Sequence, residues 1–267
     1  MTGHVVTLLL TVLASLGVHD AAREVHEVTV TIGGLSVRAL CTDGPRDVLL
    51  LHDAASSADA WRPVLERLDE RVGACAYDRR GSGGSGPPPS ERGWYELLDE
   101  LRHIHRALGF DRDYVLVGHG LGGFYARMYV IDRPREVGAM LLVAPAHEDM
   151  PQRFEAGMPD EAWRDWVSDR QVPNTDGVRE ASLDARLRRL RTPRIPVTVL
   201  TASTHRGGPG WDTRFIVEAS RALHAEILQG AAVPRHIPAD RSGHDVPRAQ
   251  PQLIVDEILR LRGFLKR

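Results

Sequence analysis

The 267-residue chain is poor in several of the residue types that mark specialised classes of protein. Lys266 is the single lysine of the sequence. The chain has 34 basic and 36 acidic residues, so it has no excess of positive charge that would favour binding to nucleic acid or to an anionic membrane surface. The chain has two cysteines, Cys41 and Cys75, which is too small a number for a disulfide scaffold or a cysteine-rich metal site. We predict that they are buried free thiols in two strands, with a bridge between them as the alternative. The 42% hydrophobic content suffices for one sizeable core.

Long hydrophobic runs are also scarce, and the most prominent one lies at the N-terminus. Residues 5–18 are too short to span a bilayer comfortably as a helix, and no Lys or Arg precedes them as in a signal peptide. We therefore predict that residues 1–24 form an apolar helix or extension, which packs on the domain of a cytoplasmic protein or joins two copies as a homodimer. The alternative is a secreted or membrane-anchored protein that uses residues 5–18 as its signal or anchor.

Beyond residue 24, strand-like and helix-like patterns alternate. Apolar and polar residues alternate over 25–32 and 35–41, on either side of Gly33-Gly34, which predicts an opening β-hairpin. Short apolar runs predict further strands at 47–51, 72–77, 113–117, 138–144, 196–201 and 233–237. Helical periodicity predicts helices at 59–69, 91–108, 121–133, 212–228 and 250–264. This alternation predicts an α/β fold with a mostly parallel sheet.

The interval 147–192 interrupts the alternation, because it carries many charges and no strand-like run. We predict that it is a helical cap inserted over the carboxyl ends of the strands, where open α/β sheets bind ligands. The core would then comprise residues 25–146 and 193–267. Trp163 and Trp166 either line a pocket under this cap or pack the cap onto the core.

The most informative segment is YVLVGHGLGGFYARMYV, residues 114–130. A predicted strand runs into a glycine-rich turn and directly into a helix, whose N-terminus favours developing negative charge. In G-x-S-x-G enzymes such a turn presents a nucleophilic serine, and here its central residue is Gly120. The turn also matches the dinucleotide pattern G-x-G-x-x-G, but it follows the fifth predicted strand, and the next strand closes with Ala144 rather than an acid. We therefore predict no cofactor.

Three further segments share this plan, each after a predicted strand: His52-Asp53-Ala54, Asp78-Arg79-Arg80-Gly81-Ser82-Gly83 and Ser242-Gly243-His244-Asp245. Together with the turn, and in this order, they resemble the α/β-hydrolase superfamily of esterases, lactonases and epoxide hydrolases from residue 25 to the C-terminus. The resemblance implies an eight-stranded, mostly parallel sheet with helices on both faces and a small helical cap. It also implies a small-molecule pocket in which the base His244 faces Gly120, with the backbone N–H groups of Ala54 and Leu121 as oxyanion donors.

The sequence departs from the superfamily pattern at three places. Gly120 has no side chain, so the usual acyl-enzyme cannot form there. Asp53 replaces the usual glycine beside the oxyanion site, where a carboxylate would oppose a developing oxyanion. The acid partner of the histidine is missing from its usual places, which leaves the following nearby candidates: Glu148, Asp149 and Asp212.

The remaining groups still support acid–base chemistry. A histidine such as His244 carries protons near neutrality, and Asp53 could orient it, unless Asp53 only caps the segment that follows. We predict a cofactor-independent, biosynthetic enzyme whose His244, Asp53 and Gly120 act on a small organic substrate as a lyase, cyclase, isomerase or bond-forming catalyst. His119, Trp163 and Trp166 are candidate pocket residues, and no metal-ligand spacing is present. The alternatives are a serine esterase or lactonase that carries glycine in place of serine at position 120, and a non-catalytic ligand-binding protein.

Overall fold

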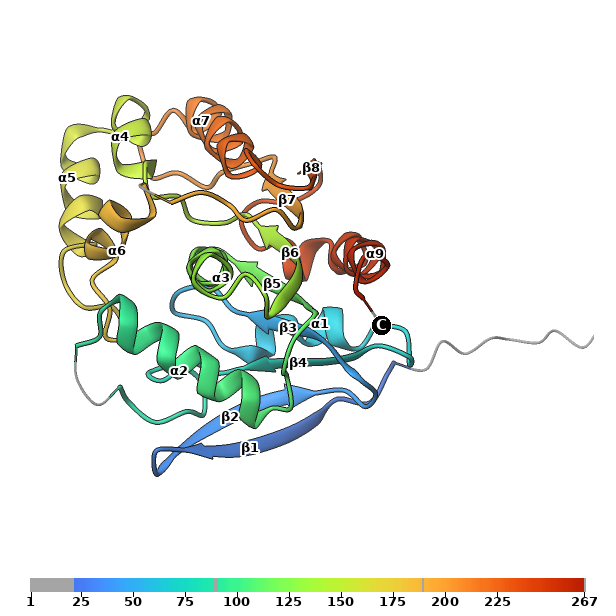
Figure 1. Ribbon diagram of the computed structural model, residues 1–267. Helices are drawn as coiled ribbons and strands as arrows, with labels where there is room; N and C mark the ends of the chain where they lie inside the picture. Colours follow the sequence, from blue (N-terminus) through green and yellow to red (C-terminus); the bar gives the residue numbers. More distant parts are fainter. Residues whose placement is uncertain (1–21, 89–90, 189, 267) are drawn as a thin grey trace, which may run out of the picture.

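The computed structural model describes residues 22–88, 91–188 and 190–266, which form one eight-stranded sheet with helices on both faces (Figure 1). The strand order is β1-β2-β4-β3-β5-β6-β7-β8. Strand β2 runs antiparallel to both of its neighbours, and the other pairs are parallel. The predicted α/β fold with an eight-stranded, mostly parallel sheet is therefore confirmed.

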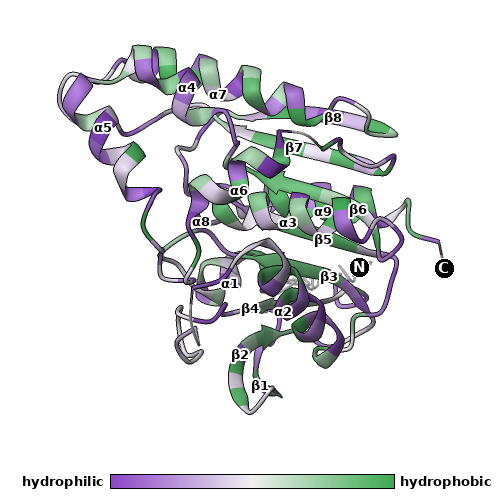
Figure 2. Cartoon of the chain, turned by 60° about the vertical axis from the view of Figure 1, so that its left-hand side comes forward, coloured by the Kyte–Doolittle hydropathy of each residue, from purple (hydrophilic) through white to green (hydrophobic). Residues whose placement is uncertain are grey.

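The predicted strands are present with small shifts at their ends. They are β1 His26–Ile32, β2 Leu35–Cys41, β3 Arg46–Leu51, β4 Gly73–Tyr77, β5 Tyr114–His119, β6 Val137–Val143, β7 Pro196–Ala202 and β8 Val233–Ala239. Gly33 and Gly34, both with positive φ, form the two-residue turn between β1 and β2, which places Ile32 opposite Leu35. Strands β4 and β5 are buried along their whole length, as expected of parallel strands covered on both faces. Figure 2 shows the centre of the sheet as the most hydrophobic part of the fold.

Helices enclose the sheet in two apolar layers. The helices are α1 Arg62–Leu65, α2 Trp94–Ala107, α3 Leu121–Asp132, α4 Met150–Phe154, α5 Asp160–Asp169, α6 Glu180–Leu187, α7 Thr213–Ile227, α8 Val246–Ala249 and α9 Pro251–Arg262, with 3-10 turns at Ala58–Trp61 and Glu155–Gly157. Buried side chains of α2 and α3 pack on one face of the sheet, and those of α1 and α9 pack on the other. The helix predicted over 59–69 is not continuous. The segment forms a 3-10 turn followed by the short helix α1, and its apolar residues are nevertheless buried.

The interval predicted as a cap contains helices α4, α5 and α6, which lie together beside one end of the sheet (Figure 1). Because the parallel strands point the same way, the loops that follow β3, β5, β6 and β7 meet at that end. The domain boundaries predicted from the sequence stay a prediction. The arrangement brings segments far apart in the chain to a single pocket, described below.

The prediction that the two cysteines are free thiols is wrong. Cys41 and Cys75 lie directly opposite each other in the antiparallel pair β2–β4 and form a disulfide, with their Cα atoms 4.2 Å apart. The sequence could not show that β2 pairs with β4 rather than with β3, and this pairing is what brings the two sulfur atoms together.

The apolar stretch 5–18, and all of the predicted extension 1–24 except residues 22–24, lies outside the described residues. Among the residues that the structure describes, no helix combines the length and the hydrophobicity needed to cross a bilayer. The cytoplasmic location and the homodimer stay predictions.

Candidate active site

The glycine-rich turn has the geometry that the sequence predicts. Strand β5 ends at His119, helix α3 begins at Leu121, and between them Gly120 has φ 50° and ψ −118°, a region that favours glycine. A Cβ atom on Gly122 would lie 2.4 Å from the carbonyl oxygens of Leu51 and His52. Glycine at this position therefore lets the first turn of α3 pack directly against the end of β3.

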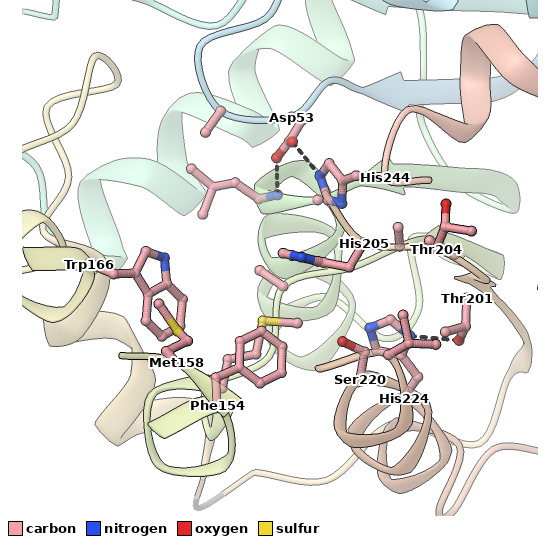
Figure 3. Close-up of a pocket in the computed structure, with 18 of the residues that line it drawn as sticks. Asp53, Phe154, Met158, Trp166, Thr201, Thr204, His205, Ser220, His224 and His244 are labelled. Atoms are coloured by element: carbon pink, nitrogen blue, oxygen red, sulfur yellow. Dashed lines mark hydrogen bonds and ion pairs between the residues drawn. The ribbon is translucent and has the colours of Figure 1, made fainter. Parts of the chain in front are cut away.

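The carboxylate of Asp53 occupies the space above Gly120. Its Oδ1 atom accepts a hydrogen bond of 2.7 Å from the backbone N–H of Leu121, and its Oδ2 atom lies 2.7 Å from Nε2 of His244 (Figure 3). A Cβ atom on Gly120 would lie only 1.9 Å from Asp53 Oδ1. Asp53 thus fills the place of a side chain at position 120 and does not cap its own segment.

Asp53 and His244 form an ion pair. Burial opposes ionisation of Asp53, but the hydrogen bond from His244, the neighbouring imidazoles and the N–H of Leu121 hold the pKa of Asp53 well below its usual range. Burial also opposes the charge on His244, but the hydrogen bond and charge of Asp53, helped by Asp245, raise the pKa of His244 above its usual value. Because an ionised carboxylate only accepts hydrogen bonds, Nε2 of His244 carries the shared proton. Its Nδ1 atom has no hydrogen-bond partner among the described residues.

A buried arginine holds the loop that carries Asp53. Arg79 donates from Nη1 to the carbonyl oxygen of His52 at 2.5 Å and from Nη2 to that of Asp53 at 3.0 Å. Its Nε atom lies 2.9 Å from Asp176, and both side chains are 1% exposed. The D-R-x-G-x-G segment therefore positions the candidate catalytic carboxylate through Arg79.

A cavity of about 330 Å³ opens above the Asp53–His244 pair, within the range of small-molecule sites. Asp53, Gly120 and His244 line one end of it. Apolar side chains of the 150–166 interval lie at the opposite end: Phe154, Met158 and Trp166 (Figure 3). The Asp53–His244 pair therefore lies at one end of a largely apolar pocket.

Comparisons with known proteins agree with this geometry. The family model described as alpha/beta hydrolase fold matches residues 48–220. The chain belongs to this family. Among curated proteins, this α/β-hydrolase is 23% identical over 232 residues to the uncharacterised protein YqjL of Bacillus subtilis, covering 85% of this chain and 88% of YqjL. It is 28% identical over 133 residues to 2-hydroxy-6-oxo-6-(2'-aminophenyl)hexa-2,4-dienoic acid hydrolase of Metapseudomonas resinovorans, covering 45% of each chain.

A solved structure shares the fold of this α/β-hydrolase over most of its length. The epoxide hydrolase CorEH superposes with a TM-score of 0.63 at 17% identity, covering 90% of this chain and 99% of CorEH. At this identity the likeness concerns the fold alone.

Of the three predicted pocket residues, Trp166 lines the cavity, and Trp163 and His119 do not. Trp166 lines the cavity, whereas the indole Nε1 of Trp163 donates to the carbonyl oxygen of Pro151 at 2.9 Å, so Trp163 packs within the helical segment. His119 lies beneath the pocket, where its Nε2 atom is 2.8 Å from the carbonyl oxygen of His244. Burial lowers the pKa of His119, which favours a neutral ring that supports the His244 backbone.

None of the three candidate acids contacts His244. Glu148 pairs with Arg127 at 2.6 Å, and Asp149 pairs with Arg188 at 2.5 Å. Asp212 accepts the N–H of Phe215 at the start of α7. The carboxylate that reaches His244 in this α/β-hydrolase is therefore Asp53, which contacts the Nε2 atom of the ring.

One cluster of described residues has the composition of a metal site. Ligand atoms of Asp53, His119 and His244 lie within 4.8 Å of one another. A cation bound there would have to replace the proton shared by Asp53 and His244, because their atoms are already in direct contact. The prediction that no metal is used stays a prediction.

The sequence does not single out four polar residues that line the pocket: Arg170, Glu180, Thr204 and Ser220. Arg170 and Glu180 belong to the helical segment, which has no motif to single them out. From the sequence, His205 is a loop residue expected near the pocket rim, where either binding or exposure to solvent is possible. In the structure it follows β7 and lines the cavity.

Proposed function

We propose that this α/β-hydrolase is an enzyme that works without a serine nucleophile and that Asp53 and His244 transfer protons to and from a small, largely apolar substrate. The observation that carries the proposal is the position of the Asp53 carboxylate, which lies in the space above Gly120 and in direct contact with His244. The largely apolar cavity above this pair supports the substrate class.

Acyl transfer is disfavoured by two features of the same site. Gly120 offers no nucleophile, and the N–H of Leu121, which the family resemblance assigns to the oxyanion, already binds the Asp53 carboxylate. An oxyanion placed there would meet a negative charge instead of a free donor. A serine at position 120 would collide with Asp53, which weighs against an esterase that has merely lost its serine.

Proton transfer uses the groups as they stand. In its protonated form His244, held in place by Asp53, donates a proton to an atom of the substrate that gains negative charge. In its neutral form the same ring accepts a proton from the substrate. Isomerisation, elimination and addition all require such steps. Hydrolysis by a water that His244 activates is the second candidate, and the names of the hydrolase relatives favour it.

The test follows the base-promoted ring opening of 5-nitrobenzisoxazole, a small flat aromatic probe, between pH 4 and pH 9. We expect a rate that exceeds that of free imidazole and rises with pH as His244 loses its proton, above the usual histidine value of about 6.5. His244→Gln should remove this limb. Asp53→Asn should move it to lower pH by about one unit, since a neutral amide no longer stabilises the imidazolium.

His103→Gln serves as the matched control, because His103 lies on α2 with a side chain 56% exposed and outside the pocket. Its profile should equal that of the unchanged protein. Persistence of the high-pH limb in His244→Gln would contradict the proposal. A rate no greater than that of free imidazole would instead favour a non-catalytic binding protein.

A further inference from the structure

A second imidazole lines the pocket beside the Asp53–His244 pair. His205 lies in the loop between β7 and α7, and its ring projects into the cavity between His244 and Phe154 (Figure 3). The reaction outlined above makes no use of it. Like His244, however, it lines the cavity.

The ring of His205 is held in place by stacking. Among the described residues, its nitrogens have no hydrogen-bond partner. It stacks on Trp211, with ring centroids 5.6 Å apart and an interplanar angle of 15°. Its Nδ1 atom is buried and has no hydrogen-bond partner in the described part of the chain. An unpartnered buried polar atom is costly and uncommon in folded proteins. A ring that is oriented by stacking and that lines the cavity is suited to bind a ligand or exchange a proton with it.

The loops of the two histidines are joined by their backbones. The N–H groups of Ser203 and Thr204 donate to the carbonyl oxygen of Ser242 at 3.1 and 3.4 Å. Ser242 precedes His244 by two residues, and Thr204 directly precedes His205. These bonds join the two loops, and both imidazoles line the same cavity.

We infer that His205 is a second proton-transfer residue of this pocket and forms an acid–base pair with His244. The inference rests on the proposed function and narrows it: the substrate loses a proton at one atom and gains one at another, as in an isomerisation or an elimination. Neither step needs a redox partner or a covalent intermediate.

The surroundings of the two rings favour opposite protonation states. Burial, followed by the charge on His244, lowers the pKa of His205. The pKa of His244 is raised because Asp53 outweighs the effect of burial. Between the two values His205 is neutral and accepts a proton, while His244 is charged and donates one. Titratable groups whose pKa values are pushed apart in this way serve as base and acid in the same site.

The ring opening of 5-nitrobenzisoxazole tests this pairing directly. His205 takes the proton from C3, the electron pair of the C–H bond forms the nitrile, and the N–O bond breaks. The phenoxide oxygen that results receives a hydrogen bond or proton from His244, so atoms and electrons balance. The pH profile should rise in two steps: a lower limb below about pH 6.5, as His205 loses its proton, and an upper limb at higher pH, as His244 loses its proton and becomes a second base for the same C–H bond.

His205→Gln should remove the lower limb, with a rate reduced about 10- to 100-fold near pH 6, and keep the upper limb. His244→Gln should remove the upper limb and keep the lower limb. His103→Gln, outside the pocket, should keep both limbs, which separates the effect at His205 from the loss of any one histidine. Thermal melting of each variant checks that it is folded.

A lower limb that persists in His205→Gln, or that is missing from the unchanged protein, would overturn the inference about His205. An upper limb that persists in His244→Gln would overturn the proposed function instead, so the two failures can be told apart. Loss of the lower limb in His205→Gln together with loss of the upper limb in His244→Gln supports both.

Discussion

The two ends of the pocket are built in different ways. At one end Asp53, Gly120 and His244 form a polar floor, fixed by hydrogen bonds and anchored to the sheet. At the other end Phe154, Met158 and their neighbours form an apolar wall, which belongs to a small core cluster separate from the two that flank the sheet. The rings of Phe154 and Trp166 stack 5.8 Å apart within this wall.

This difference assigns different tasks to the two ends. The floor has directional contacts of 2.7 Å between charged or polar atoms, so a small displacement changes which proton can move. The wall has non-directional contacts that select a ligand by its size and apolar surface. Substitutions in the floor should therefore change chemistry or stability, whereas substitutions in the wall should change affinity.

The largest effect should follow from removing the arginine beneath the floor. Arg79→Met leaves Asp176 buried without its cationic partner and removes the arginine hydrogen bonds to the backbone oxygens of His52 and Asp53. We expect a loss of about 3–5 kcal/mol in the free energy of unfolding, as for other broken buried ion pairs. Chemical denaturation measures it. Arg112→Met, at a side chain 78% exposed, is the control and should cost less than about 0.5 kcal/mol. Equal losses in both variants would show that Arg79 does not hold the floor.

The second largest effect should come from a site within the sheet, between β2 and β4, at residues that do not line the pocket. The Cys41–Cys75 disulfide closes a loop with a sequence separation of 34 residues. Cys41→Ala combined with Cys75→Ala should cost about 2–4 kcal/mol in the free energy of unfolding while leaving the pH profile unchanged. A reducing agent should destabilise the unchanged protein to the same extent and leave the double variant unaffected.

Thiol titration of the purified protein completes this test. Two free thiols per chain would contradict the disulfide. Because disulfides persist mainly in oxidising compartments, an oxidised pair would favour the exported alternative over the predicted cytoplasmic location.

The floor can also be rebuilt to carry the missing nucleophile. Gly120→Ser alone should be labelled only slowly by a fluorophosphonate probe, because Asp53 occupies the space of the new side chain. Adding Asp53→Gly removes the carboxylate and frees the N–H of Leu121, so the introduced serine should react about 100-fold faster than in the single variant. Mass spectrometry of the labelled protein measures both rates. Equal labelling of the single and double variants would show that Asp53 does not block position 120.

The sequence predicts much of this arrangement, because the succession of strands and helices along the chain follows from alternating patterns and the turn at Gly120 follows from its glycines. It also indicates Asp53 and His244 as the candidate site. The contact between them lies beyond its reach, since 191 residues separate the two side chains and the local sequence around Asp53 equally allows a cap.

The search for an acid partner of His244 shows why the contacts of the other site residues could not be predicted. Glu148, Asp149 and Asp212 are all near the expected site along the chain, and which arginine or backbone N–H each one meets depends on helix packing. The same holds for the tryptophans, since Trp163 and Trp166 lie only three residues apart and yet one packs within the helical segment while the other reaches the cavity. Periodicity places such residues on an element but does not identify their neighbours.

The smallest effect should come from the wall. Phe154 is 6% exposed and lines the cavity, so Phe154→Ala removes apolar contact with a bound ligand without touching a proton. We expect KM for 5-nitrobenzisoxazole to rise about tenfold, with kcat changed less than about twofold, as for lost uniform binding. Phe264→Ala, at a ring 43% exposed near the C-terminus, removes the same group outside the pocket and should change neither constant. A fall in kcat with KM unchanged would mean that the wall also positions the reacting atoms, and the division of tasks between wall and floor would not hold.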